Sequence, residues 1–457
     1  MSVPMSMAAT VVLYPSPGIG HLISMVELGK LILTRHPSFS ITIFTTTTSF
    51  NTGSTGPYLR RVSSTTPSIT FHNLPLIPLD PASFPSTEAI TFELLRLNTP
   101  HVRRSLLSLS TTTTIAAFVI DLFCTPALPL GSELNIPSYY FFTSSAGCLD
   151  CFLYLPTIHQ NINQSFKDLN TDLYFPNLPP IPAADMPSPM LERNSTEYEC
   201  FIDFFNHMPK SDGIIVNTFE ALEPRALKAI SAGLCVPNGV TPPVFCIGPL
   251  IASGEDRGGG GGDVEECLTG AIEGDCNRVG EEWAEVFVGG AGSTHANPGA
   301  FGIARPRFGF VAPGRFLGPD EGEGDGGPVV GPAGGGAAAR FGGWVRDSLR
   351  VELGVGSRVR WGSDGGVLAW PLYAEQRLNR VLLVKEMKLA LWMNESESGF
   401  VTAEEVEKRV TELMDSEEGK AVRDRVKAAS EGTREAMREG GSSRVALAKL
   451  VESWKQS

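Results

Sequence analysis

Four consecutive segments near the start of the chain decide the fold. They are Ala9-Thr-Val-Val-Leu-Tyr14, Pro15-Ser-Pro-Gly-Ile-Gly20, His21-Leu-Ile-Ser-Met-Val-Glu-Leu-Gly-Lys-Leu-Ile-Leu33 and Ser40-Ile-Thr-Ile-Phe-Thr-Thr46. The first is apolar and β-branched, which is typical of a strand buried on both faces. A turn follows, then apolar residues at helical spacing, then an alternating second strand. This order predicts the strand–helix–strand unit of a parallel sheet with right-handed crossovers.

The same pattern continues through the first half of the chain. Short apolar runs predict further strands at 115–121, 138–143, 213–218 and 243–249. A helix is expected from Glu220, and the Pro-rich stretch 175–182 predicts an extended surface loop. We therefore expect a doubly wound α/β domain.

Two polar residues follow predicted strands at the edge where such sheets bind ligands. His21 comes after the glycines of the first turn, and Asp121 ends a strand that is a candidate neighbour. A histidine oriented by a carboxylate removes a proton from a hydroxyl at neutral pH. From spacing alone, the alternative is that each residue only caps the helix that follows it.

Composition excludes several classes of protein. The 457 residues are 42% apolar and 19% charged, with 37 basic against 50 acidic residues and a net charge of −13. An acidic balance argues against nucleic acid as a partner, because phosphate binding needs clustered Lys and Arg. No apolar run approaches the roughly 18 residues that span a bilayer, and the start lacks a basic signal-peptide region. We expect a cytoplasmic monomer without a membrane segment.

The cysteines indicate neither a disulfide framework nor a zinc site. All eight are scattered over the long chain. Cys148 and Cys151 form a C-x-x-C pair, but the Phe, Leu and Tyr around them favour core packing over a redox role.

Several motifs together resemble plant family-1 UDP-glycosyltransferases. They are the segment 15–30, Val119-Ile-Asp121, Ser211-Asp-Gly-Ile-Ile-Val-Asn-Thr-Phe-Glu-Ala-Leu-Glu223, Cys246-Ile-Gly-Pro249 and Ala369-Trp-Pro-Leu-Tyr-Ala-Glu-Gln-Arg-Leu-Asn379. The segments 386–397 and 399–407 are similar to the subgroup that glucosylates chalcones, isoflavones and related phenols. The resemblance covers about residues 8–252 and 368–457.

This resemblance implies a GT-B fold, in which two Rossmann-like domains face each other across the active site. It also implies an inverting UDP-glucose-dependent O-glucosyltransferase that acts on phenolic hydroxyls. His21 would be the general base and Asp121 would orient it and balance its charge. UDP-glucose would be a co-substrate, with no metal and no resident cofactor. A phenol with a pKa near 10 needs only the modest help that a neutral imidazole gives.

The resemblance also places the substrates. Glu375 and Gln376 match the acid–amide pair that binds sugar hydroxyls, and Thr143 and Trp370 are further candidates for the donor sugar. Five residues of the first domain are candidates for the acceptor pocket: Gly20, Phe123, Phe141, Phe142 and Cys148. For the apolar members of this set, plain core packing is the alternative.

The pattern breaks in the second half. Of 48 glycines, 32 lie between Gly254 and Gly366, and the segment 254–368 contains no Lys, Tyr, Gln or Met. The family's uracil-binding Trp-Ala-Pro-Gln and diphosphate-binding His-Cys-Gly-Trp-Asn-Ser motifs are missing from it. One interpretation is a flexible insertion or linker.

Codons suggest another interpretation. GC-rich codons for Trp-Ala-Pro-Gln and the residues after it, read one base early, give nearly Val330-Gly-Pro-Ala-Gly-Gly-Gly-Ala-Ala-Ala-Arg-Phe-Gly-Gly343. The same shift of the diphosphate motif gives Gly343-Trp-Val-Arg-Asp-Ser-Leu-Arg-Val-Glu-Leu353, and a third match lies at 274–283. We therefore expect that about 270–368 is an out-of-frame translation of the donor-binding region.

These observations predict that the chain is divided into four segments. Residues 1–252 would form the acceptor-binding domain, 253–368 the aberrant Gly-rich region, 369–440 a remnant of the UDP-sugar-binding domain, and 441–457 a helix that packs back on the first domain. Thr402-Ala-Glu-Glu405 is a capping box that predicts the start of a helix.

Two other functions compete with an impaired glucosyltransferase. A first domain that keeps its pocket would be a non-catalytic phenol-binding remnant. An NAD-type oxidoreductase rests only on the Rossmann pattern, and Gly18-Ile-Gly20-His21 lacks the spacing of G-x-G-x-x-G.

Sequencing the transcript across codons 270–368 tests the frame hypothesis. We expect the bases to encode Trp-Ala-Pro-Gln and His-Cys-Gly-Trp-Asn-Ser one frame away. A transcript without these codons in any frame would refute it.

Overall fold

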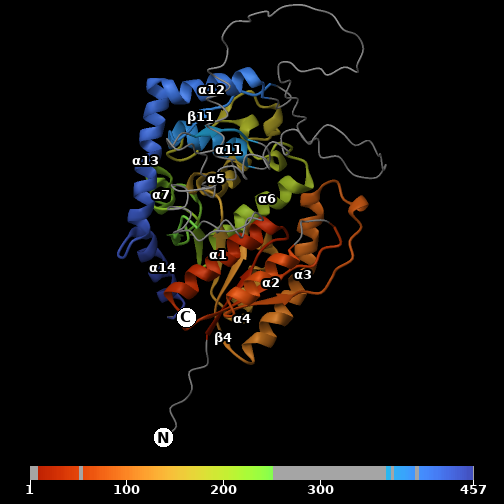
Figure 1. Cartoon of the computed structure of the whole chain (residues 1–457). Helices are drawn as coiled ribbons and strands as arrows, with labels where there is room; N and C mark the ends of the chain where they lie inside the picture. The colour runs from red at the N-terminus through yellow and green to blue at the C-terminus, as the bar shows by residue number, and fades with distance from the viewer. Residues whose placement is uncertain (1–8, 51–54, 251–366, 372–374, 397–400, 456–457) are drawn as a thin grey trace, which may run out of the picture.

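The computed structural model describes residues 9–50, 55–250, 367–371, 375–396 and 401–455, and the first half contains a seven-stranded sheet (Figure 1). Its strands are β1 (Ala9–Tyr14), β2 (Ser40–Thr45), β3 (Ile69–Asn73), β4 (Thr114–Asp121), β5 (Ser138–Phe142), β8 (Gly213–Val216) and β9 (Val244–Cys246). The order is β3-β2-β1-β4-β5-β8-β9, and every neighbouring pair is parallel. The strand order therefore reverses between β1 and β4, where doubly wound sheets bind ligands.

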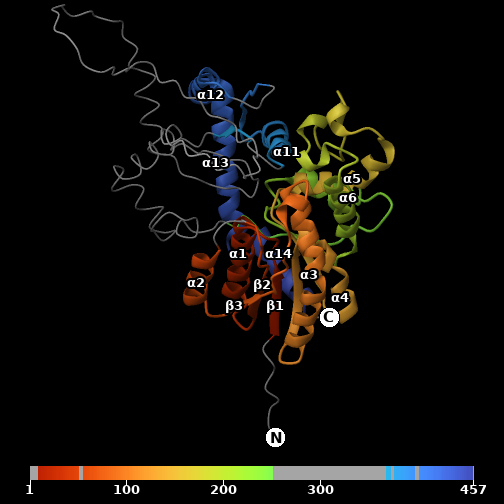
Figure 2. The same cartoon turned by 90° about the vertical axis from the view of Figure 1, so that its right-hand side faces the viewer.

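Helices cover both faces of this sheet (Figure 2). One face packs against α1 (Ile19–Arg35), α2 (Gly56–Thr65) and α14 (Ser442–Ser453). The other face packs against α3 (Thr87–Ser110), α4 (Pro129–Leu134), α5 (Ala146–Asn161), α6 (Thr196–His207) and α7 (Pro224–Ser231). The result is a three-layer α/β unit.

Strand β1 shows why the opening segment specifies a central strand. Val12 and Tyr14 join the core on one face, whereas Val11 and Leu13 join the core on the other. All four are at most 1% exposed. Only a strand covered by helices on both sides buries consecutive apolar residues in this way.

Most of the predicted elements of the first half are confirmed, but one expectation is wrong and another is wrong in part. The helix expected from Glu220 begins at Pro224. The expectation of a surface loop at 175–182 is wrong in part: 175–180 is a loop, but Phe175 and Leu178 are buried, and the stretch ends in β7 (Ile181–Pro182), which pairs with β6 (Asp172–Leu173). The apolar side chains between the prolines hold this loop against the core.

The described part of the second unit is small. Strand β10 (Leu368–Ala369) pairs in parallel with β11 (Leu391–Trp392). Helix α11 (Gln376–Val381) continues into a π-helical turn (Leu382–Glu386). Two longer helices follow, α12 (Ala403–Asp415), with Thr402 as the predicted cap, and α13 (Glu417–Met437). A separate apolar cluster around Leu383, Leu391 and Leu413 joins the two strands, the π-helical turn, α12 and α13. The buried apolar side chains of α11 belong instead to the core of the first unit. The predicted out-of-frame segment 270–368 lies outside the described residues, apart from 367 and 368.

The C-terminal helix α14 packs against the first unit. Leu447, Leu450 and Trp454 belong to the core cluster shared by α1 and the sheet. The Ser443 hydroxyl donates a hydrogen bond to the Gly248 carbonyl at 2.6 Å, and the hydroxyls of Ser453 and Tyr139 lie 3.0 Å apart. Figures 1 and 2 show α13 leading from the second unit down to α14 beside the sheet.

The described cysteines and helices carry no sign of a disulfide or a membrane span. All six described cysteines are free, and Cys148 and Cys151 are fully buried. No helix among the described residues has the length and apolar character to cross a bilayer.

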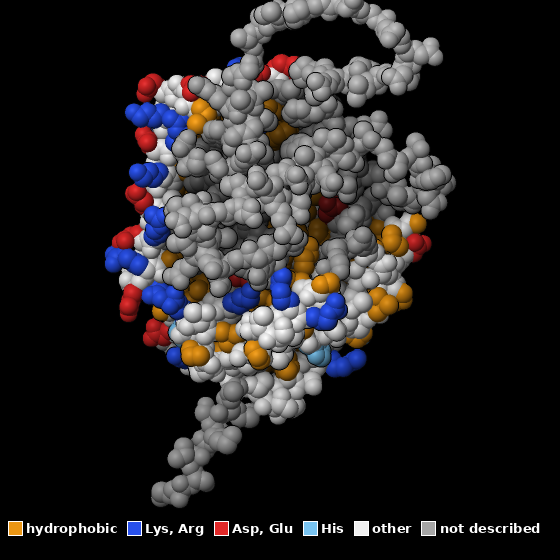
Figure 3. Space-filling model, in the orientation of Figure 1, with side chains coloured by type: hydrophobic (Ala, Val, Ile, Leu, Met, Phe, Trp, Pro, Cys, Tyr) orange, Lys and Arg blue, Asp and Glu red, His pale blue; other side chains and the backbone are white. Residues whose placement is uncertain are grey.

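Acidic and basic side chains alternate along the edge formed by α12 and α13 (Figure 3).

We predict that Leu450→Ala loosens the first unit although it lies at the far end of the sequence. Leu450 is fully buried, so its truncation is expected to cost about 2–5 kcal/mol in the free energy of unfolding. Urea unfolding followed by circular dichroism measures the loss, and amide exchange of β5 localises it. Val445→Ala is the matched control, because Val445 on the same helix is 40% exposed and its change should stay within about 0.5 kcal/mol. Unchanged exchange in β5 would contradict this role.

Candidate active site

The site lies at the carboxyl ends of β1 and β4, where the strand order reverses. The turn after β1 leads into α1, and His21 stands in the first turn of that helix. The conformation depends on Gly18, which adopts φ 125°, a value that other residues rarely adopt. Asp121 is the last residue of β4. The sheet thus brings together two residues that are 100 positions apart in the sequence.

His21 and Asp121 form a hydrogen-bonded pair. His21 Nδ1 donates to Asp121 Oδ2 at 2.9 Å. The other carboxylate oxygen, Oδ1, accepts the backbone N–H of Phe123 at 3.1 Å. Asp121 is 3% exposed, so both of its contacts are sheltered from water. These bonds hold the carboxylate fixed and set the tautomer of the imidazole, which leaves Nε2 to accept a proton.

The charges around His21 raise its pKa. Burial acts to lower the pKa, but the charge and hydrogen bond of Asp121 raise it, and Glu375 raises it further. The net result is a pKa above the usual value for histidine. The His21 side chain is 34% exposed, so water still reaches the ring and limits the loss of solvation. This environment stabilises the imidazolium that forms when His21 takes up a proton.

An aromatic cluster borders the pair. The Phe123 ring packs edge-on against His21 with centroids 5.6 Å apart. Phe92 on α3 and Phe201 and Phe204 on α6 surround Phe123 at 5.5, 5.8 and 6.4 Å. Sequence reasoning found Phe123 but missed the other three. The run Cys200-Phe-Ile-Asp-Phe-Phe205, apolar at helical spacing on α6, is the signal that could have indicated Phe201 and Phe204.

The turn from β5 to α5 carries Thr143 and Cys148. Thr143 follows β5 directly and is half-buried, whereas Cys148 lies in the first turn of α5 and is fully buried. Glu223, which was not expected from the sequence, fixes this turn. Its carboxylate accepts the backbone N–H groups of Ala146 and Gly147, both at 2.9 Å, and the Thr218 hydroxyl at 2.6 Å. Burial raises the pKa of Glu223, although these hydrogen bonds oppose the rise.

The structure separates the candidate acceptor residues. Phe142 and Cys148 belong to the same core cluster that Phe123 packs against, whereas Phe141 belongs to the cluster on the opposite face of the sheet. Successive residues of a strand point to opposite faces, so Phe141 and Phe142 cannot line one wall. Phe141 is 1% exposed and has the packing role that was the alternative. Gly20 is exposed, and a Cβ there would meet nothing within 4 Å.

Three of the four candidate donor residues lie on the second unit, whereas Thr143 lies on the first. Glu375 precedes α11 and Gln376 is its first residue, while Trp370 follows β10. Gln376 is 1% exposed, and Glu375 and Trp370 are half-buried. Because Glu375 also contributes to the raised pKa values of His21 and Cys148, it lies within electrostatic range of both.

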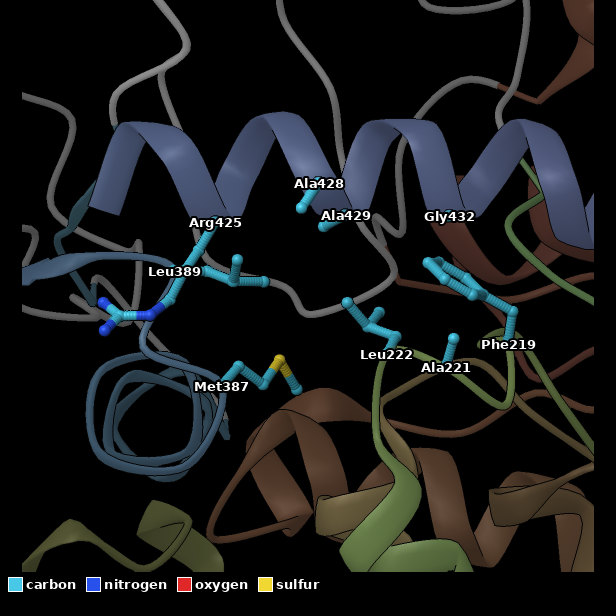
Figure 4. Close-up of a pocket in the computed structure, with 9 residues that line it drawn as sticks. All are labelled: Phe219, Ala221, Leu222, Met387, Leu389, Arg425, Ala428, Ala429 and Gly432. Atoms are coloured by element: carbon cyan, nitrogen blue, oxygen red, sulfur yellow. The ribbon is translucent and has the colours of Figure 1, made fainter. Parts of the chain in front are cut away.

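Two cavities of the described structure do not include His21 among their lining residues. One of about 340 Å³ lies over β1, β2 and β3 and is rich in hydroxyl groups, from Ser16 and Thr45 to Thr48. The other, of about 230 Å³, lies between α13 and the segment 219–222 (Figure 4). Its described lining is apolar apart from Arg425. No group of three or more metal-ligating side chains occurs in the part of the chain that the structure describes.

The chain is similar over nearly its full length to known enzymes. UDP-glycosyltransferase 88B1 of Stevia rebaudiana is 41% identical over 468 residues, which cover 98% of this chain and 99% of that protein. Phloretin 2'-O-glucosyltransferase of Pyrus communis is 40% identical over 495 residues, with 98% and 100% coverage. No family model matches the chain.

A solved structure gives the same result for the fold. Phytolacca americana UGT2 complexed with UDP-2fluoro-glucose and pterostilbene has a TM-score of 0.70 and 25% identity. The similarity covers 99% of this chain and 100% of that one. It is consistent with the expected GT-B architecture.

We predict that Asp121→Asn lowers the pKa of His21. The amide keeps an oxygen for the Phe123 N–H but removes the negative charge that raises the pKa. Histidine NMR titration measures the change. A raised folded-state pKa stabilises the protein below the unfolded value of about 6.5, and this stabilisation is lost as pH rises through the folded pKa. Asp121→Asn should therefore destabilise the protein more at pH 5.5 than at pH 8.

The control for this prediction is Asp203→Asn. Asp203 pairs with His207 at 3.3 Å on the surface of α6. It should leave the pKa of His21 unchanged. An equal pKa in the wild type and in Asp121→Asn would show that the carboxylate does not govern His21.

Proposed function

The chain belongs to the plant UDP-glycosyltransferase family, and from that premise we propose that it derives from an inverting glucosyltransferase for phenolic hydroxyls. The proposal rests on the 2.9 Å hydrogen bond between His21 and Asp121 at the reversal point of the sheet. UDP-glucose is the co-substrate, and no resident cofactor or metal takes part.

His21 acts as the general base. Nδ1 is held by Asp121, so Nε2 takes the proton from the acceptor hydroxyl. The phenolate oxygen then attacks the anomeric carbon of the sugar from the face opposite UDP. A new carbon–oxygen bond forms as the bond to the diphosphate breaks, and UDP leaves with the electron pair. Asp121 balances the positive charge on His21 throughout.

The aromatic cluster recognises the acceptor ring. Phe123 lies against His21, and Phe92, Phe201 and Phe204 support it from two helices. Edge and face contacts with these rings suit a flat phenol and leave its hydroxyl at the imidazole. The names of relatives agree, since they include a phloretin 2'-O-glucosyltransferase and an anthocyanidin 5,3-O-glucosyltransferase. Phe142 and Cys148 belong to the core against which this aromatic cluster packs, and they support it from there.

Glu375 and Gln376 bind the hydroxyls of the donor sugar, with Thr143 and Trp370 beside them. A carboxylate accepts hydrogen bonds, and an amide both donates and accepts them, so the pair distinguishes hydroxyl positions. The electrostatic effect of Glu375 on His21 supports a position beside the base.

The chain as written lacks the other half of the donor site. Neither Trp-Ala-Pro-Gln nor His-Cys-Gly-Trp-Asn-Ser occurs in the sequence, so the uracil and diphosphate contacts have no residues to make them. We infer that transferase activity is small or absent. The protein would then be a phenol-binding remnant, because its aromatic cluster and dyad are both present. It would act as a monomer in the cytoplasm.

We predict that the chain as written forms little or no glucoside from UDP-glucose and phloretin. A version with the reading frame restored across 270–368 should form it readily, because that frame encodes the missing motifs. Product formation is followed by liquid chromatography. His21→Ala in the restored version should abolish turnover while phloretin still binds.

Fluorescence quenching distinguishes a glucosyltransferase from a non-catalytic phenol-binding remnant. Quenching by phloretin without a response to UDP supports a binding remnant. Robust glucoside formation by the chain as written would overturn the inferred impairment. A restored version that works equally well without His21 would overturn the proposed base.

A further inference from the structure

A buried ion-pair cluster joins the second unit to the first. Arg380 of α11 is 3% exposed. Its Nη2 donates to Asp185 Oδ1 at 3.1 Å, and its Nη1 donates to Glu395 Oε1 at 3.0 Å. The guanidinium plane lies over the Trp392 ring at 3.9 Å from the centroid. One arginine therefore contacts a carboxylate of each unit and an aromatic face.

Arg380 is the most sheltered of the described polar links between the units. Asp185 lies in a short 3₁₀ helix (Ala183–Asp185) directly after β7, 195 residues before Arg380. Arg225 and Glu386 also bridge the units at 2.9 Å, but the Arg225 side chain is 61% exposed. Exposed pairs hold their partners weakly, whereas breaking a buried pair leaves an uncompensated charge. The Asp185–Arg380 contact therefore has the greater control over where α11 lies.

The position of α11 matters because the helix begins at the candidate sugar-binding pair. The Asn379 N–H donates to the Glu375 carbonyl at 2.9 Å, so one helical turn connects Glu375 to Arg380. Gln376 and Arg380 are four residues apart and are both buried, which places them on the same face. Leu382 follows and packs closely on Gly147 at the start of α5, where a Cβ would come within 3.0 Å of it.

We propose that Arg380 is a positioning residue that holds the start of α11, and with it Glu375, against the His21–Asp121 pair. The guanidinium fork acts through the helix and does not touch the reacting atoms. Without it, α11 keeps the apolar contacts of Leu378, Val381 and Leu382 with the core of the first unit but loses its buried polar link to that unit, and Glu375 moves away from His21. The proposal relies on the proposed function only for the meaning of Glu375 as a sugar ligand.

The pKa of His21 tests the proposal without any need for turnover. The charged groups that act on His21 in the described structure are Asp121 and Glu375. Glu375→Gln should lower the pKa of His21, and Arg380→Met should lower it by a similar amount. The sign is informative, because removal of a positive charge would by itself raise the pKa. A fall therefore reports the displacement of Glu375. Histidine NMR titration measures it, with the His21 signal assigned by its loss in His21→Gln.

Two further variants complete the experiment. Arg380→Met added to Glu375→Gln should cause no further fall, because both act through one carboxylate. Arg409→Met is the matched control, since Arg409 bridges Glu405 and Glu412, both at 2.7 Å, within α12 alone. It removes a half-buried arginine of the same kind and should leave the pKa of His21 unchanged.

The outcomes decide the proposal. A folded Arg380→Met with an unchanged or raised His21 pKa overturns it, as does an equal fall in Arg409→Met. Additive falls in the double variant also overturn it. If circular dichroism shows that Arg380→Met does not fold, Arg380→Lys replaces it, because lysine keeps the charge but loses the fork. A smaller fall in Arg380→Lys is then expected, and no fall refutes the proposal. The pKa of His21 can be measured in this way whether or not the chain turns over UDP-glucose.

Discussion

The parallel pairing of β1 with β4 is the contact on which the rest of the site depends. These two strands lie where the sheet reverses its order, so the loops after them diverge to opposite sides and leave a crevice between them. The turn after β1 delivers His21 and the end of β4 delivers Asp121 to that crevice. The ladder is long and buried, which fixes the distance between residues that the sequence places far apart.

The strands and turns that carry His21 and Asp121 could be predicted from the sequence, because residues close together in the chain specify them. Ala9–Tyr14 and the turn that follows carry enough β-branched and glycine character to specify strand, turn and helix. Strand β3 was missed because its side chains are mostly exposed and its run Ile69–Asn73 is partly polar. Phe92, Phe201 and Phe204 were missed because they meet Phe123 only after three separate elements pack together.

Long-range polar contacts were the least predictable part. Nothing near Asp185 indicates a partner almost two hundred residues away, and nothing near Glu223 indicates that it caps α5. Such contacts follow from topology and not from periodicity. Phe141 and Phe142 were both candidates for the acceptor pocket, with core packing as the alternative, and alternation along the strand places them on opposite faces of the sheet. The roles of the individual site residues stay predictions until the proposed variants are measured.

The path of α14 has a consequence for how the protein is made. One apolar face of the central sheet is covered by Leu447, Leu450 and Trp454, which are synthesised some two hundred residues after the last strand of that sheet. The first unit is therefore synthesised before the helix that covers this face. The face stays exposed to solvent while some two hundred further residues are translated. Exposed apolar surface of this kind in a nascent chain favours chaperone binding and aggregation. A stop codon anywhere before Ser442 would release a protein whose first unit, and not only its second, is incomplete.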